Sequence, residues 1–289
     1  MTGQPRQRSW LPPLTLLAVA AVYGWTFVLV KQVLAVYPVL PYLGLRFGLA
    51  VLVLAAILRR WPARVAWRVG LPVAVALAAG YFFQTEGMVS IKPGIAGLLT
   101  GLFVVFTPLC DRLLFRTRLR TKTVVSVVAA LGGTFLLTGG GAGISIGDLL
   151  VLVSALAFAF QIVLLSHSRE SSWSLGLIQM SVCAVVFLCL GTSAGVPYPV
   201  VTGEVAFVLA VTGVLASALA VLAQTWAQQK MSASRAGLLL AAEPALALAF
   251  AVVLTGERLD WLQLVGALVL IGAILGHEMV FSNEVAARP

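Results

Sequence analysis

The sequence predicts an all-α integral membrane protein in which ten transmembrane helices form two inverted five-helix repeats. Three observations lead to this fold class: the composition, the spacing of the apolar runs and an internal repeat. Of the 289 residues, 61% are hydrophobic and 10% are charged, whereas a soluble domain carries roughly 25% charged residues. A surface exposed to water cannot carry so many apolar side chains, whereas a surface exposed to lipid tails can. We therefore expect a lipid bilayer around most of the chain.

Ten apolar runs are long enough to cross a bilayer, which takes ~20 mostly apolar residues in a helix. Turn residues and charges separate the runs, as at Lys92-Pro93-Gly94 and Pro197-Tyr198-Pro199. The runs are continuous, so they predict helices and not the alternating strands of a membrane barrel. In chain order the expected spans are 14–31, 40–58, 69–89, 94–115, 121–138, 147–166, 173–194, 203–227, 233–254 and 260–281.

The basic residues indicate how these spans are oriented. With the N-terminus in the cytoplasm, 15 of the 19 Lys and Arg residues fall on the inner side, three fall on the outer side, and Arg46 lies within a span. Short cytoplasmic loops carry such an excess of positive charge. We therefore expect a multi-pass protein of the cytoplasmic membrane with both termini cytoplasmic. The first apolar run is expected to be an uncleaved transmembrane helix and not a signal peptide. The net charge of +9 is explained by these loops, so it does not indicate a nucleic-acid partner.

An internal repeat appears when the sequence is shifted by 140 residues. Ala96-Gly97-Leu98-Leu99 then aligns with Ala236-Gly237-Leu238-Leu239, and Arg118-Leu119 aligns with Arg258-Leu259. The repeat pairs the fourth and fifth spans with the ninth and tenth, so the expected halves are residues 1–141 and 142–289. Five spans in each half reverse the orientation of the second half. Inverted halves are common in secondary transporters, because exchanging the conformations of the halves exposes a central site to either side.

Several short motifs, in order along nearly the whole chain, support a family resemblance. They are Tyr23-Gly24-Trp25-Thr26-Phe27, Leu45-Arg46-Phe47, Gln84-Thr85-Glu86-Gly87-Met88, Gly97-Leu98-Leu99-Thr100-Gly101-Leu102, Gln224-Thr225-Trp226-Ala227-Gln228, Glu243-Pro244 and Gly256-Glu257-Arg258-Leu259. With these motifs the chain resembles the EamA branch of the drug/metabolite transporter superfamily. The resemblance implies ten helices, inverted halves and a central cavity for a small metabolite or drug. One departure is that the first half reads Arg116-Thr117-Arg118-Leu119, without the acidic residue of the second half.

The expected function is secondary transport of a small organic solute by alternating access. Export and proton coupling are the expectations that the family resemblance favours, with uptake or facilitated diffusion as the alternative within transport. From another class, a membrane-embedded enzyme acting on a lipid-linked substrate stays open, as does a non-transporting assembly partner. The substrate, the coupling ion and the oligomeric state stay open as well.

Charged groups within the spans are the first candidate site residues, since each costs roughly 2.5–3.5 kcal/mol at a helix centre. Glu243, midway along the ninth span, is expected either to bind a cation or proton or to hydrogen-bond the backbone freed by Pro244. Arg46 and Glu86 lie at similar depth near the outer ends of the second and third spans. They are expected to form an ion pair that gates the outer side, or else to reach the headgroups and water separately.

Uncharged side chains complete the candidate solute site. Trp25 is at mid-depth, where an indole N–H needs a partner, and Tyr81 shares a helix face with Gln84. Gln161 is a further candidate, whereas Gln179 is expected to hydrogen-bond between helices as structural glue. The small residues Gly97 and Gly101 are expected to let helices pack closely.

No enzyme chemistry is predicted. The sequence contains no phosphate loop of the Walker type, no His-Glu-x-x-His pair and no Gly-x-Ser-x-Gly elbow. The histidines His167 and His277 are isolated, and the three cysteines lie in apolar runs without metal-ligand spacing. We therefore expect no catalytic residue, no metal site and no cofactor.

Overall fold

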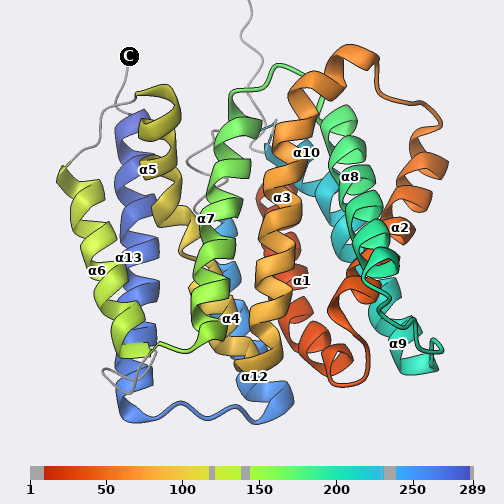
Figure 1. Cartoon of the computed structure of the whole chain (residues 1–289). Helices are drawn as coiled ribbons and strands as arrows, with labels where there is room; N and C mark the ends of the chain where they lie inside the picture. Colours follow the sequence, from red (N-terminus) through yellow and green to blue (C-terminus); the bar gives the residue numbers. More distant parts are fainter. Residues whose placement is uncertain (1–9, 117–120, 138–143, 229, 231–238, 287–289) are drawn as a thin grey trace, which may run out of the picture.

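The computed structural model of the chain describes residues 10–116, 121–137, 144–228, 230 and 239–286, and these residues form a bundle of helices without a strand (Figure 1). The first half of the chain forms α1 (Leu11–Leu34), α2 (Val39–Leu58), α3 (Arg64–Ser90), α4 (Pro93–Thr100), α5 (Phe103–Phe115) and α6 (Thr121–Leu137). The second half forms α7 (Ile146–Ser166), α8 (Ser172–Ser193), α9 (Gly203–Leu209), η1 (Ala210–Leu219), α10 (Ala220–Gln228), α12 (Glu243–Thr255) and α13 (Trp261–Ala286).

Seven helical segments of the described residues are long and apolar enough to cross a membrane. Three shorter apolar helices, Val124–Leu137, Glu243–Thr255 and Trp261–Gly276, lie where the remaining spans were expected. α3 begins at Arg64 and not at the expected residue 69, because Arg64 and Arg68 end the apolar run without ending the helix. Residues 233–238 of the expected span 233–254 lie outside the described residues.

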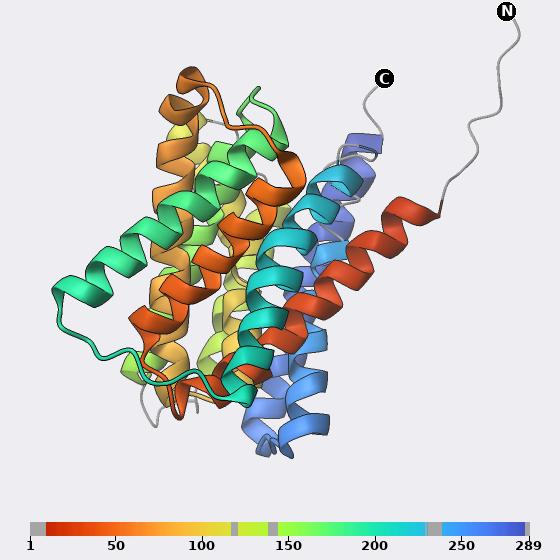
Figure 2. The same cartoon turned by 90° about the vertical axis from the view of Figure 1, so that its right-hand side faces the viewer.

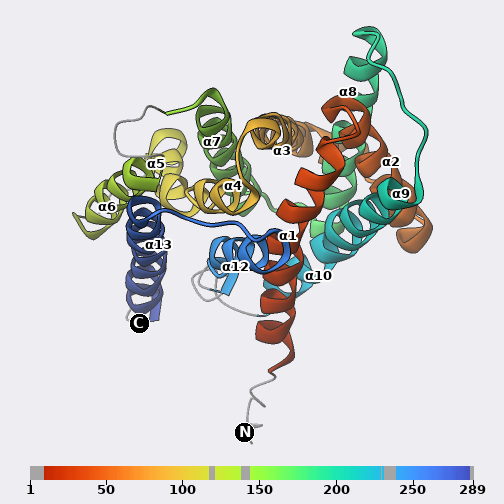
Figure 3. The ribbon, with the colours of Figure 1, turned by 90° about the horizontal axis from the view of Figure 1, so that it is seen from below.

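The helices run up and down between two ends of the bundle, which we call the first end and the second end. The first end holds the start of α1, the α2–α3 turn and the ends of α5, α7 and α13, and the second end holds the α1–α2, α3–α4, α8–α9 and α12–α13 turns (Figures 1 and 2). α6 and α13 lie together at one edge, and α2, α8 and α9 lie at the opposite edge. α1, α4 and α12 pass between these groups, as the view along the bundle shows (Figure 3).

Glycines allow the central helices to approach closely. A Cβ added at Gly24 would lie 2.9 Å from the backbone nitrogen of Ala247, and one added at Gly97 would overlap the Ala247 side chain. A Cβ at Gly101 would overlap Pro244 in the same way. The expectation that Gly97 and Gly101 serve close packing is therefore confirmed, and it is α12 that packs against them.

Two helices are interrupted at related places. The expected span 94–115 is divided into α4 and α5 at Gly101-Leu102, and α12 is preceded by a turn at Ala241-Ala242. α5 and α12 are both 13 residues long, with a 140-residue offset between them. Each ends in a residue with left-handed backbone, Arg116 (φ 56°) and Gly256 (φ 66°). The same offset therefore relates the breaks, the lengths and the caps.

Polar side chains cap helices at the second end. Lys31 Nζ donates to the carbonyl oxygens of Met88 and Val89, both at 2.8 Å, where α3 ends. The buried Glu257 carboxylate accepts a 2.9 Å hydrogen bond from the Gly94 backbone N–H at the start of α4. Carboxylates are favourable at helix N-termini and cations at C-termini. The turn at Glu257 thus holds α12 and α13 against the start of α4.

Candidate functional site

Glu243 is the first residue of α12, at the turn that interrupts the bundle interior. The 13-residue helix places it about 18 Å along the axis from Thr255 at the second end. The sequence placed Glu243 midway along a span and beside a proline. In the structure a turn at Ala241-Ala242 precedes it, so that α12 begins at Glu243. Pro244 explains the local structure, since it has no N–H to donate and is favourable in the first turn of a helix.

The Glu243 carboxylate has no hydrogen bond or ion pair with any residue that the structure describes. The bond to freed backbone, one of the two expectations, is therefore not seen there; α12 has no side-chain cap. The Glu243 side chain is only partly buried, although it lies deep in the bundle. Glu243 interacts electrostatically with Tyr23 of α1 and Tyr81 of α3. A carboxylate of the second half is thus close enough to tyrosines of the first half for their charges to interact.

Tyr23 links α1 to α10 beside this carboxylate. Its hydroxyl donates a 2.9 Å hydrogen bond to Oε1 of Gln224. Trp25 lies two residues further along α1 and therefore on a different face. Its ring meets the Phe207 ring edge-on, with centroids 6.3 Å apart. The indole N–H, for which we expected a partner, has none among the described residues.

Arg46 is 3% exposed and is held between the two halves of the chain. Its Nε donates a 3.0 Å hydrogen bond to Oγ of Ser217 in η1, and its guanidinium carbon lies 4.8 Å from the centroid of the Tyr81 ring. The expected ion pair with Glu86 does not form, and the alternative that Arg46 reaches the headgroups is also wrong. Glu86 is partly exposed on another face of α3, without a bond to a described residue.

Tyr81 and Gln84 bring α3 to the same region. The Tyr81 ring lies between the rings of Phe47 (centroid distance 4.9 Å) and Phe158 (5.3 Å). Gln84 Nε2 donates a 3.1 Å hydrogen bond to Oγ1 of Thr100, the last residue before the break between α4 and α5. Tyr81 therefore contacts α2 and α7, and Gln84 contacts α4 directly before the α4–α5 break.

Gln161 has a structural partner. Its Nε2 donates a 2.7 Å hydrogen bond to Oε1 of Gln179, which itself bonds the carbonyl oxygen of Leu175. The interpretation of Gln179 as glue between helices is confirmed. Gln161 is the other member of that α7–α8 pair, one turn of α7 beyond Phe158.

The residues that sequence reasoning missed are Tyr23, Gln224 and Ser217. Tyr23 and Gln224 stand in the family motifs, which was their signal in the sequence. Ser217 lies in the π-helical segment η1, for which the apolar run gives no signal. π-helical turns are frequent at functional sites, and here the segment presents Ser217 to Arg46.

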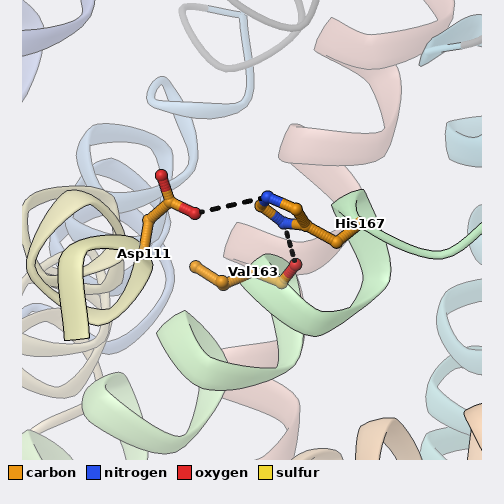
Figure 4. Close-up of polar contacts among 3 residues, drawn as sticks. All are labelled: Asp111, Val163 and His167. Atoms are coloured by element: carbon orange, nitrogen blue, oxygen red, sulfur yellow. Dashed lines mark hydrogen bonds and ion pairs between the residues drawn. The ribbon is translucent and has the colours of Figure 1, made fainter. Parts of the chain in front are cut away.

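A further polar contact joins the halves near the first end (Figure 4). His167 Nε2 lies 3.6 Å from Oδ1 of Asp111 in α5, and Nδ1 lies 3.0 Å from the carbonyl oxygen of Val163. The imidazole also stacks on Phe115, with centroids 3.7 Å apart. The sequence suggested that His167 is isolated, but the structure places it against Asp111 and Phe115. The described residues contain no group of three or more His, Cys, Asp or Glu side chains suited to a metal ion.

Two grooves lie away from the cluster of Tyr23, Arg46, Tyr81 and Glu243. One, of about 600 Å³, is entirely apolar and lies between α3, α5 and α7. The other, of about 540 Å³, lies between the end of α1 and α9, where Gln32, Glu204 and Phe207 line it. Phe207 also contacts Trp25, so this second groove reaches one candidate residue from the side of the second end.

Comparisons with known proteins agree with the fold. The model of the EamA-like transporter family matches residues 10–139 and again 145–277. An uncharacterized transporter of Archaeoglobus fulgidus is 29% identical over 269 residues, which cover 91% of this chain and 84% of that protein. A protein of known crystal structure superposes with a TM-score of 0.66 at 18% identity, covering 94% of this chain and 98% of the other. That last likeness concerns the fold alone.

Proposed function

This chain belongs to the EamA-like transporter family of multi-pass membrane proteins, and we propose that it moves a small organic solute with a cationic group across the cytoplasmic membrane by alternating access. The solute would bind where the two halves of the chain meet, at Glu243. The expected membership of the drug/metabolite transporter superfamily is confirmed by the family match. A transporter is also what the family and the relative indicate in place of an enzyme.

The proposed architecture is ten transmembrane helices in two inverted halves, residues 1–141 and 142–289, with both termini in the cytoplasm. The double family match supports two halves. The equal lengths of α5 and α12, their shared 140-residue offset and their left-handed caps support a repeat. Arginines at the first end support a cytoplasmic first end; they are Arg59, Arg60, Arg64, Arg68, Arg112, Arg116 and Arg169.

The observation that carries the proposal is the Glu243 carboxylate, deep in the bundle and without a bonding partner among the described residues. An ionised group at that depth is costly unless it is paired. Either a proton or a cationic solute can neutralise it, but both cannot occupy the carboxylate together. Release of one would therefore favour binding of the other, which is the basis of exchange between solute and protons. We propose export as the direction.

The other members of the proposed site would shape the solute. Tyr23 and Tyr81 present aromatic rings near Glu243, and ring faces attract organic cations. Arg46 is already engaged by Ser217 and Tyr81, so we assign it to positioning of Tyr81. Gln84 would hold the α4–α5 break, and Trp25 would offer its indole N–H from the α9 side. We leave Glu86 and Gln161 out of the proposed site, because Glu86 lies on another face of α3 and Gln161 is bonded to Gln179.

A lipid-linked enzyme remains the alternative from another class. Such an enzyme needs catalytic groups gathered at one membrane interface, whereas the proposed site around Arg46, Tyr81 and Glu243 lies away from both ends of the bundle. An assembly partner without transport would need no unpaired carboxylate at the centre of the bundle. Both alternatives are weaker on these grounds.

The test is a thermal-shift screen of the purified protein with amino acids, amines, nucleosides and cationic drugs, followed by flux of each hit into proteoliposomes. We expect stabilisation by compounds with an amine or other cationic group, and transport of at least one of them. Stabilisation by anionic compounds alone, or hits that are never transported by folded protein, would contradict the proposal.

A further inference from the structure

The apolar groove between α3, α5 and α7 has the features of a lipid site. α3 contributes Leu71, Val75, Ala76 and Ala79 to its wall, and the opposite walls include Leu114 of α5 and Leu164 of α7. The lining has no polar surface. A polar solute would lose its hydrogen bonds there without replacement, whereas an acyl chain would gain contact on three sides.

An arginine stands at one end of the same stripe. Arg68 precedes Leu71 by three residues, and spacings of three and four residues continue through Val75 to Ala79, so these side chains share one face of α3. Arg68 is exposed and bonds no residue that the structure describes. Arg116, two residues after Leu114, is exposed at the same end. The groove is thus apolar along its length and cationic at its mouth.

The stripe from Arg68 to Ala79 on α3 matches one leaflet in length. From Arg68 to Ala79 the helix rises about 16 Å at 1.5 Å per residue. Half of a bilayer's hydrocarbon core is about 15 Å. A lipid with its phosphate at Arg68 would therefore extend its chain along the groove to the middle of the membrane. Arg64, one helical turn before Arg68 on α3, adds to the attraction for an anionic headgroup.

We propose that this groove binds one anionic phospholipid of the leaflet at the first end, with an acyl chain between α3, α5 and α7 and the headgroup phosphate on Arg68 and Arg116. The site is separate from Glu243 and does not depend on what the protein transports. Its ligand is selected by negative charge at the headgroup and not by the chain, since the groove wall makes apolar contacts alone.

The test measures lipid retention by native mass spectrometry of the full-length protein in detergent. Dioleoyl phosphatidylglycerol and dioleoyl phosphatidylcholine are added at equal concentration, so that the two lipids differ in headgroup charge but not in chains. We expect one phosphatidylglycerol to be retained in preference. Arg68→Gln should weaken that retention about fivefold, the effect of one arginine near an anionic surface. Arg59→Gln is the matched control, an exposed first-end arginine at the end of α2, and should retain the lipid.

A second variant separates the groove from the charge. Ala76→Trp fills the groove without removing an arginine and should reduce the retention of phosphatidylglycerol in protein that stays monodisperse. The proposal is overturned if both lipids are retained equally and Arg68→Gln changes neither. It is also overturned if Ala76→Trp leaves lipid retention intact, or if its effect is the loss of a dimer, since the groove would then bind a second copy of the chain.

Discussion

Arg46 in α2 and Ser217 in η1, 171 residues apart, are joined by a 3.0 Å hydrogen bond that buries a guanidinium between the two halves. The π-helical turns of η1 are what present the hydroxyl. A Cβ added at Gly213 of η1 would lie 2.9 Å from the backbone oxygen of Arg46, so α2 and η1 approach closely here. The contact fixes where the Arg46 charge lies relative to Tyr81.

Ser217→Ala is expected to destabilise the protein, because it leaves a buried guanidinium one acceptor short. Interhelical hydrogen bonds in membrane proteins contribute about 0.6 kcal/mol on average and up to about 1.7 kcal/mol, and we expect a loss near the upper figure since the donor is charged. Thermal unfolding in detergent measures it. Ser193→Ala, at an exposed serine near the end of α8, is the control. Equal melting temperatures for the two variants would contradict a stabilising role for Ser217.

Gly97→Ala is expected to separate α4 from α12, because the added methyl overlaps the Ala247 side chain. Overpacking of this kind costs about 1–3 kcal/mol. Gly132→Ala in α6 is the matched control, since a Cβ there meets no atom within 4 Å; removing a helical glycine should stabilise it by up to about 1 kcal/mol. The same melting experiment compares the two. A Gly97→Ala protein as stable as Gly132→Ala would show that α4 and α12 are not in close contact.

Glu257 makes stability depend on pH. Burial in the α12–α13 turn raises the pKa of its carboxyl, and the Gly94 N–H and Lys92 oppose the shift without cancelling it. A carboxyl whose folded-state pKa is raised contributes stability that is present below its unfolded pKa. That stability is lost as pH rises through the folded value. Wild type should therefore lose stability as pH rises from about 4, the ordinary glutamate value, through the raised pKa of Glu257.

Glu257→Gln keeps an acceptor for Gly94 and removes this titration. We expect the variant to match wild type at about pH 4 and to be the more stable protein at about pH 7. Melting temperatures of both proteins across that range provide the measurement. A wild type that gains stability relative to the variant as pH rises would contradict this prediction. The carboxylate would then be stabilised by its partners more than it is penalised by burial.

The apolar runs predicted the helices because membrane crossing depends on length and hydropathy. The ends differ where another force acts, as at α3, which continues through Arg64 and Arg68 beyond the apolar run. The break at Gly101-Leu102 was not predicted, since no local pattern marks that position, whereas Pro244 marks the place of the break before Glu243. Arg46 was paired with the wrong partner: Ser217 is distant in sequence, and η1 leaves no pattern in an Ala/Leu/Val-rich run.

Candidate site residues were predictable where a physical cost marked them. Glu243 and Arg46 are charges within spans, and both lie between the halves. Glu86 is also a charge within a span, but it lies on another face of α3 and does not pair with Arg46. Tyr23 and Gln224 carried no such cost, because a tyrosine and a glutamine are ordinary in membrane helices. Their hydrogen bond joins residues 201 positions apart, which no local pattern reveals.

The most direct test of the central claim is the flux, in proteoliposomes, of the solute that gives the largest thermal shift, compared between wild type and Glu243→Gln. The amide keeps the shape of the side chain but carries neither negative charge nor a titratable proton. Glu204→Gln, at an exposed glutamate in the first turn of α9, is the matched control. We predict that Glu243→Gln abolishes flux, or uncouples it from protons, at unchanged yield of folded protein, and that Glu204→Gln transports as wild type does. Unchanged, proton-dependent flux by folded Glu243→Gln would contradict the account.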